Sequence, residues 1–411
     1  MRDRRSQLLL FGLAALTVEI VLRFGRLGDY PSDAGPAVKA LAGGHVVAAL
    51  RAEPLMGMVS ILLRAPAVAL VRLAGAGEVG AYRAGALACL LPAAWLAMQL
   101  VASFGVAAAN RWKRVVAAVL VVASPASVAA LQFGHPEEVL AGSLVVGAVA
   151  LAARKRPVAA GLALGLAVAT KQWALVAIAP SIAAAPRGQR ARLAGIAAAA
   201  AAAFVIPVVA ADPSGFVHMN HTAASTHTTV TRTTIWFLLA AAHVTHLHLP
   251  AGYPSELTIY QVPQWVGALA HPLVVLAPVP LVALFAVRRR QVDPMEMLGV
   301  LALAFLLRCV LDPVDNAYYH VPLLLSLVAW EVLGRARLPV VSALTAAAAW
   351  VTFDRIEPVA RPEVTNAFYL AWTAGLATYV VCALLTSSRP VATPSELWIR
   401  VRALSSAFVR I

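Results

Sequence analysis

The stretch Arg23–Glu53 reads RFGRLGDYPSDAGPAVKALAGGHVVAALRAE and follows a first apolar segment at residues 8–22. It places two carboxylates, Asp29 and Asp33, just beyond the predicted face of a membrane. Charged residues make up only 13% of the chain, and most of them are basic. Two acids four residues apart at this position therefore predict a functional loop. We expect one of them to be a catalytic base, Asp33 first and Asp29 as the alternative.

The composition indicates the class of protein. Of 411 residues, 61% are hydrophobic and only 13% are charged. A soluble chain carries roughly a quarter charged residues. Backbone polar groups in lipid need internal partners, and no alternating barrel pattern is present, so we predict an all-α, polytopic integral membrane protein. The net charge of +14 comes mostly from arginines in short loops, which indicates cytoplasmic loops and no nucleic-acid partner. Cys89, Cys309 and Cys382 show no metal-ligand spacing, so we expect packing roles and no metal site.

The topology depends on the apolar run at residues 54–73. If it crossed the membrane, the basic cluster at 110–114 and each later one would lie outside. Arg64 and Arg72 also suit a helix lying along the outer surface. With that interfacial helix, the rule that basic loops stay in the cytoplasm predicts about twelve spans. They are 8–22, 84–104, 115–132, 138–152, 157–170, 173–186, 193–210, 264–287, 295–311, 319–333, 338–353 and 366–385.

We expect one membrane domain, residues 1–386, and a cytoplasmic tail, residues 387–411. Its two long outer loops are residues 23–83 and 211–263, and the second holds an apolar piece near 235–248 that we expect to be re-entrant or an interfacial helix. Of 19 acidic residues, 13 fall on the outer side of this map. Because the map was built from basic residues, this asymmetry independently predicts an outer face that uses carboxylates.

Three cations are candidate phosphate ligands. Lys171 interrupts a pair of apolar helices at the predicted outer surface, which suits a phosphate partner, although snorkelling to the surface would also account for it. Arg308 is a second candidate, and the alternative is an ion pair with Asp312 or Asp315. Arg64 on the interfacial helix is the third.

Other polar residues gather where predicted spans meet the outer face. Acids at the start of a helix also cap it, so the GHPEE segment at 134–138 either orients a substrate or caps the next helix. The loop histidines match no strict metal motif, which favours an ordinary polar loop. The candidate substrate-binding residues are His135, Glu137, Glu138, Asp315, Tyr319 and His320.

Three stretches resemble the C-type glycosyltransferase superfamily (the GT-C fold), most closely its bacterial polyprenol-phosphate-mannose-dependent mannosyltransferases. Residues 32–44 resemble the loop in which an acid precedes a leucine- and glycine-containing helix. Residues 134–138 stand where that superfamily has a polar motif. Residues 161–171, GLALGLAVATK, resemble its "GLALGLA…TK" stretch. The tyrosine that usually follows the loop acid is missing, which leaves the base open between Asp29 and Asp33.

The resemblance implies a multi-pass plasma-membrane enzyme with an extracytoplasmic active site. Its donor would be a polyprenyl-phosphate sugar and its acceptor a hydroxyl of a glycan or glycolipid. It implies no cofactor and leaves a divalent metal open. The rival class is a transporter or lipid flippase, and a third is a noncatalytic scaffold. Transporters often show internal repeats and midplane charges, whereas this chain shows no convincing repeat and its charges gather at one surface.

Overall fold

Each of the twelve segments predicted to span the membrane contains a helix in the computed structural model. Among the residues that the structure describes, eight helical stretches are long and apolar enough to cross a membrane, which confirms the all-α polytopic class. Expectations for the N-terminal residues and for the tail at 387–411 lie outside the described residues. The structure describes residues 10–19, 27–52, 57–104, 110–225, 228–246, 256–288 and 293–386.

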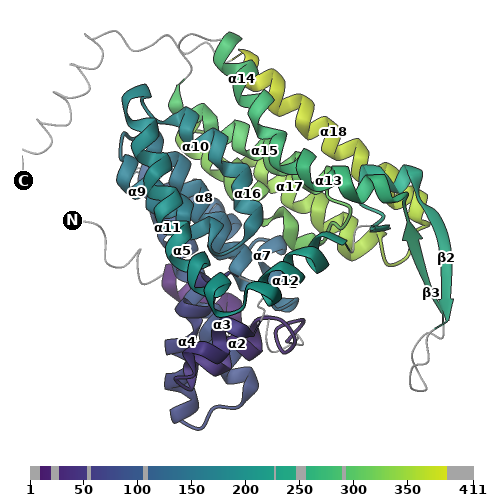
Figure 1. Ribbon diagram of the computed structural model, residues 1–411. Coiled ribbons are helices and arrows are strands. Elements are labelled where there is room, and N and C mark those ends of the chain that lie inside the picture. The colour runs from purple at the N-terminus through teal and green to yellow at the C-terminus, as the bar shows by residue number, and fades with distance from the viewer. Residues whose placement is uncertain are drawn as a thin grey trace, which may run out of the picture.

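The bundle is built from apolar helices, several of which begin at a proline (Figure 1). Proline is pre-organised for the first helical position, and at α7 the Ser124 hydroxyl also accepts the Ser127 N–H at 3.2 Å. The helices are α5 (Glu78–Ser103), α6 (Arg111–Val122), α7 (Pro125–Gln132), α8 (Pro136–Ala153), α9 (Pro157–Val168), α10 (Ile178–Ala184), α11 (Arg190–Ala211), α12 (Pro213–Ser225), α13 (Gln264–Leu276), α14 (Pro278–Arg288), α15 (Met297–Leu311), α16 (Val321–Ala329), α17 (Val340–Trp350) and α18 (Pro362–Thr386).

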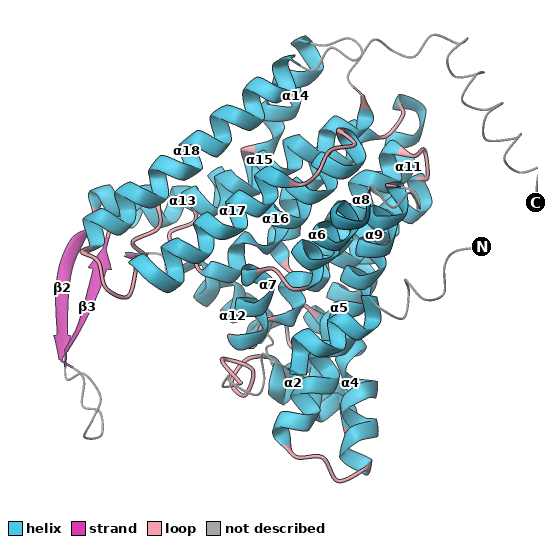
Figure 2. Cartoon of the chain, turned by 180° about the vertical axis from the view of Figure 1, so that it is seen from behind, coloured by secondary structure: helices cyan, strands magenta, loops and turns pink. Residues whose placement is uncertain are grey.

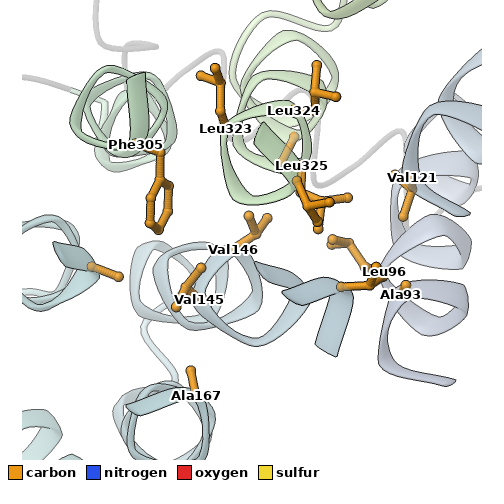
Figure 3. Close-up of a cluster of buried hydrophobic side chains, with 14 of the residues drawn as sticks. Ala93, Leu96, Val121, Val145, Val146, Ala167, Phe305, Leu323, Leu324 and Leu325 are labelled. Carbon is orange, nitrogen blue, oxygen red and sulfur yellow. The ribbon is translucent and has the colours of Figure 1, made fainter. Parts of the chain in front are cut away.

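Helix α8 lies at the centre of the bundle, packed against α5, α9 and α16. Its Val145 and Val146 face Phe305 of α15 and leucines of α16 (Figure 3). Helices α9 and α11 can pack closely because residue 165 is a glycine. A Cβ at that position would collide with the carbonyl oxygen of Ala197. The GxxxG spacing that begins at Gly161 therefore serves helix packing.

Three short helices project from one end of this bundle (Figure 2). They are α2 (Ala34–Ala42), α3 (Val46–Arg51) and α4 (Met58–Leu73). Of the helix predicted at 54–73, the structure shows Met58–Leu73 as helical, and residues 54–56 lie outside the described residues. Near its end Leu70 and Leu73 are exposed beside Arg72, the mixture expected of a helix at a membrane surface.

The prediction of a re-entrant or interfacial helix near 235–248 is wrong. Residues Ile235–Leu239 form a 3-10 turn, and β2 (Ala241–His246) then pairs antiparallel with β3 (Glu256–Gln261), while β1 (Thr229–Val230) pairs with the other edge of β3. The hairpin projects from the side of the bundle (Figure 1). The apolar piece is too short for an independent helix, and β-branched residues on both strands favour a sheet.

The loops that were assigned to the outer face meet at one end of the bundle. Backbone hydrogen bonds join them although they are far apart in the sequence. These bonds run from the Asp29 N–H to the Phe133 carbonyl (3.0 Å), from Gly57 to Thr170 (2.9 Å) and from Thr231 to Pro313 (3.0 Å). The α2–α4 unit is therefore fixed to the helix ends that carry the candidate site.

Candidate active site

The centre of the charged cluster is Glu137, in the first turn of α8 and fully buried. Three cations surround its carboxylate. Arg64 Nη1 lies 3.4 Å from Oε2, while Lys171 Nζ (3.3 Å) and His135 Nδ1 (3.0 Å) lie near Oε1. Glu137 was expected to contact substrate, but the structure encloses it among these groups. It acts on their positions and charges.

His135 links this buried carboxylate to the first loop. Its Nδ1 faces Glu137, and its Nε2 lies 3.3 Å from Asp29 Oδ2. Both nitrogens can donate only if the ring is an imidazolium. Burial lowers the pKa of His135, but the bond and the charge of Glu137 outweigh it, so the pKa is raised. The ring stacks on Tyr318 with centroids 4.7 Å apart.

The two loop acids meet beside that histidine. Asp29, Asp33 and His135 each offer a ligand atom within 4.8 Å of the others, a set that suits a divalent cation as well as proton transfer. The Asp29 side chain is 59% exposed. Asp33 stands at the start of α2 and is half-buried, and burial raises the pKa of its carboxyl group against the opposing charge of His135. The Ser32 hydroxyl donates to Asp33 Oδ1 at 3.3 Å.

Lys171 turns inward and does not snorkel. It lies in extended conformation between α9 and the 3-10 helix Gln172–Ala177, and its Nζ is 3.3 Å from both Glu137 Oε1 and Glu138 Oε1. Burial lowers the pKa of Lys171, yet the two glutamates outweigh it and raise the pKa, so the ammonium stays charged. Trp173 Nε1 donates to Glu138 Oε1 at 3.2 Å, and Glu138 Oε2 has no hydrogen-bond partner among the described residues.

Arg308 faces the same cluster from α15. Its guanidinium lies over the rings of Tyr319 (4.5 Å) and Trp173 (4.9 Å), and Nη1 donates to the Tyr319 carbonyl oxygen at 3.3 Å. Within the described part of the chain it forms no ion pair with Asp312 or Asp315, and its buried Nε has no hydrogen-bond partner. The side chain therefore keeps hydrogen-bonding capacity for a ligand.

Arg64 lies deeper than its position on a surface helix suggested. The residue is 1% exposed, and its guanidinium lies over the rings of Tyr30 (4.8 Å) and Tyr82 (5.9 Å). Together with the Glu137 contact, this packing holds Arg64 inside the protein. Sequence reasoning gave no role to Tyr30 or Tyr82, because nothing in the sequence signals an aromatic pair 52 positions apart that packs at 4.9 Å between centroids.

Asp315 and His320 form a separate cluster. His320 Nε2 lies 3.2 Å from the Tyr369 hydroxyl and 3.8 Å from Asp315 Oδ2, and all three residues are buried. No hydrogen bond or ion pair between described residues joins Asp315 or His320 to Glu137, Lys171 or the loop acids. The structure therefore divides the predicted substrate-binding residues into two groups.

An apolar cavity of about 190 Å³ adjoins Lys171. It lies between the start of α4 and helices α9, α11 and α12. Lys171 and Gln172 are the polar residues of its wall. The larger apolar residues that line it are Met58, Leu175, Phe204, Phe216 and Met219. The lysine thus stands between this cavity and the charged cluster.

A polytopic helical bundle with a buried cluster of carboxylates and cations at one end defines a membrane protein built for chemistry at a surface. The model of Glycosyltransferase family 87 matches residues 65–313, more than half of the chain. The chain belongs to this family and is a membrane glycosyltransferase. The match includes Glu137, Glu138, Lys171 and Arg308 and leaves the loop acids outside. No curated protein and no solved structure matches the chain.

Proposed function

We propose that this enzyme transfers a sugar, with mannose as the first candidate, from a polyprenyl-phosphate donor to a hydroxyl of a glycan or glycolipid. The reaction would take place at the extracytoplasmic face of the plasma membrane. Family membership supports sugar transfer. The lipid-phosphate donor is inferred from the site.

The observation that carries the proposal is the position of Lys171. A polyprenyl-phosphate sugar has an apolar chain and an anionic head, and it needs a site that serves both. The cavity lined by Met58, Phe204 and Phe216 offers an apolar environment, and the buried ammonium of Lys171 lies in its wall. A cation in a low-dielectric surrounding binds phosphate more strongly than one in water.

Arg308 supplies a second positive charge next to Lys171. The two are linked through Trp173, whose ring lies under the guanidinium and whose indole N–H holds the carboxylate of Glu138. In the transfer step the bond between the anomeric carbon and the phosphate oxygen breaks, and the leaving phosphate gains charge. Lys171 and Arg308 would stabilise that charge.

Asp33 is the better base of the two loop acids. Asp29 already faces the imidazolium of His135, whereas Asp33 has the neighbouring Ser32 hydroxyl as its side-chain partner. The raised pKa brings the Asp33 carboxylate closer to the working pH, which favours proton transfer. The acceptor oxygen attacks the anomeric carbon and its proton passes to Asp33. Asp29 and His135 would then orient the loop.

The test is transfer from labelled polyprenyl-phosphate mannose and, in parallel, polyprenyl-phosphate arabinose by membranes with and without the enzyme. We expect Asp33→Asn to lower transfer by about 10²–10⁴-fold, the usual contribution of a general base. Asp354→Asn, at an exposed position on the same chain, is the matched control. If Asp33→Asn and Asp29→Asn both leave transfer unchanged, the mechanism is wrong.

A further inference from the structure

The cluster around Asp315 is unexplained by sugar transfer. Asp315 is 1% exposed, and among the described residues the Tyr369 hydroxyl is the one side chain that hydrogen-bonds to its carboxylate. Its backbone is held in place, because its N–H donates to Thr231 Oγ1 at 2.9 Å and the Thr233 hydroxyl donates to its carbonyl at 3.4 Å. A buried carboxylate with a single neutral donor is costly and calls for a compensating cation or proton.

His320 presents a lone pair to the same space. Its Nδ1 lies 3.4 Å from the carbonyl oxygen of Asn316, a partner that requires the proton to be on Nδ1. Nε2 then carries the lone pair, and it faces Asp315 Oδ2 at 3.8 Å. Histidines that bind metals are oriented in this way, with the other ring N–H donated to a backbone carbonyl.

Cys309 completes the set. Its sulfur lies within 4.8 Å of ligand atoms of both Asp315 and His320, and all three side chains are buried. Among the described residues, the Tyr369 hydroxyl has one proton for two acceptors, His320 Nε2 at 3.2 Å and the Asp315 carboxylate. The Cys309 thiol donates to the Tyr319 carbonyl oxygen at 3.5 Å. Sulfur, carboxylate oxygen and imidazole nitrogen together are a ligand set that zinc accepts.

We propose that Cys309, Asp315 and His320 bind one zinc ion, with Tyr369 or a water molecule in the fourth position. On binding, the Cys309 thiol gives up its proton and the thiolate bonds to the metal. Ligands of tetrahedral zinc lie about 3.3–3.8 Å apart, so the three side chains need to close by about 1 Å. The proposal does not rest on the proposed sugar transfer.

Such an ion would stabilise the part of the fold that carries Arg308. It would tie the end of α15, which holds Cys309, to the loop that holds Asp315 and to the start of α16. Sequence reasoning predicted no metal here, because positions 309, 315 and 320 match no ligand motif. The burial of all three side chains and their close approach appear only in the folded chain.

The experiment measures metal in the full-length enzyme, purified in detergent through a tag without histidine and without chelators. We expect about one zinc per chain in the native enzyme. The affinity for zinc should fall at least about tenfold in Cys309→Ser and in Asp315→Asn. Cys89→Ser, a buried cysteine outside the cluster, should keep the metal. Cobalt-loaded enzyme should show a thiolate-to-cobalt absorption band that Cys309→Ser removes.

A second measurement covers variants that fold poorly. A membrane-permeant chelator should lower the unfolding temperature of the native enzyme and leave that of Cys309→Ser unchanged. Native enzyme that folds without any bound metal would overturn the proposal, since a proton on Asp315 would then balance the site. Equal zinc in the native enzyme and in Cys309→Ser would overturn it too, because the ion would be bound elsewhere.

Discussion

Two buried glutamates, one at each end of the bundle, differ in how many of their carboxylate oxygens have hydrogen-bond partners. Glu331, past the end of α16, accepts hydrogen bonds from the Ser342 hydroxyl (2.6 Å), the Ser342 N–H (2.8 Å) and the Val341 N–H (3.1 Å). Glu138, at the start of α8, uses one oxygen for Trp173 and Lys171, and its other oxygen has no hydrogen-bond partner among the described residues.

The difference separates structure from function. Glu331 satisfies the free N–H groups at the start of α17, and both of its oxygens have protein partners, which is what a purely structural carboxylate requires. Glu138 and Arg308 are also buried, yet in the described part of the chain each has a polar atom without a hydrogen-bond partner. A buried polar atom without a protein partner can hydrogen-bond to a ligand, so such atoms indicate a binding site.

The largest effect is expected at Glu137. In Glu137→Gln the side chain keeps its size, but Arg64 loses its carboxylate partner and Lys171 keeps only Glu138. Breaking a buried pair in this way costs about 3–5 kcal/mol of unfolding free energy, and sugar transfer should fall with it. Thermal unfolding in detergent, read together with transfer, checks both. A Gln variant as stable and active as the native enzyme would mean that Glu137 is not the organising charge.

Lys171→Met should affect donor binding as well as stability, because Glu137 and Glu138 also lose this cation. If Lys171 binds the donor phosphate as proposed, the variant loses a charge-assisted hydrogen bond worth about 1.5–3 kcal/mol, so kcat/KM for the donor should fall about 10- to 100-fold. Varying the donor concentration at saturating acceptor measures this. Lys155→Met, at an exposed lysine away from the cavity, is the control. Equal loss in both variants would remove Lys171 from the donor site.

Glu331→Gln should affect stability alone. The amide keeps one acceptor oxygen, so we expect a loss of about 1–2 kcal/mol in unfolding free energy and an unchanged KM for the donor. The unfolding temperature and KM measured on the same preparation test this. A change in KM without loss of stability would erase the distinction between the two glutamates.

The smallest expected effect is the contribution of His135 to the pH dependence of stability. Because the pKa of His135 is raised in the folded state, its contribution to stability is fully present below its unfolded pKa of about 6.5 and is lost as pH rises through the folded value. The native enzyme should therefore lose its stability advantage over His135→Gln above that range, by about 1–2 °C in unfolding temperature. An advantage that grows with pH would show that His135 is neutral in the folded state.

The helices could be predicted from the sequence because hydropathy alone defines them. The partners in the site could not, since they come together only in three dimensions. Arg64 and Glu137 are 73 residues apart, and Asp29 and His135 are 106 apart. An arginine on an apolar helix suits a membrane surface or a buried pair equally well, and only the position of Glu137 decides between them. The short strands were missed because an apolar run of that length fits either a turn of helix or a strand.

Gly57 allows the start of α4 to pack tightly against the turn that holds Lys171. Its N–H donates to the carbonyl of Thr170, and a side chain there would collide with the carbonyl of Ala169. Because position 57 has no room for even a methyl group, the start of α4 packs directly against the turn that holds Lys171. We therefore expect any opening that admits the proposed lipid donor to come from the other side of the cavity, where α11 and α12 form the wall.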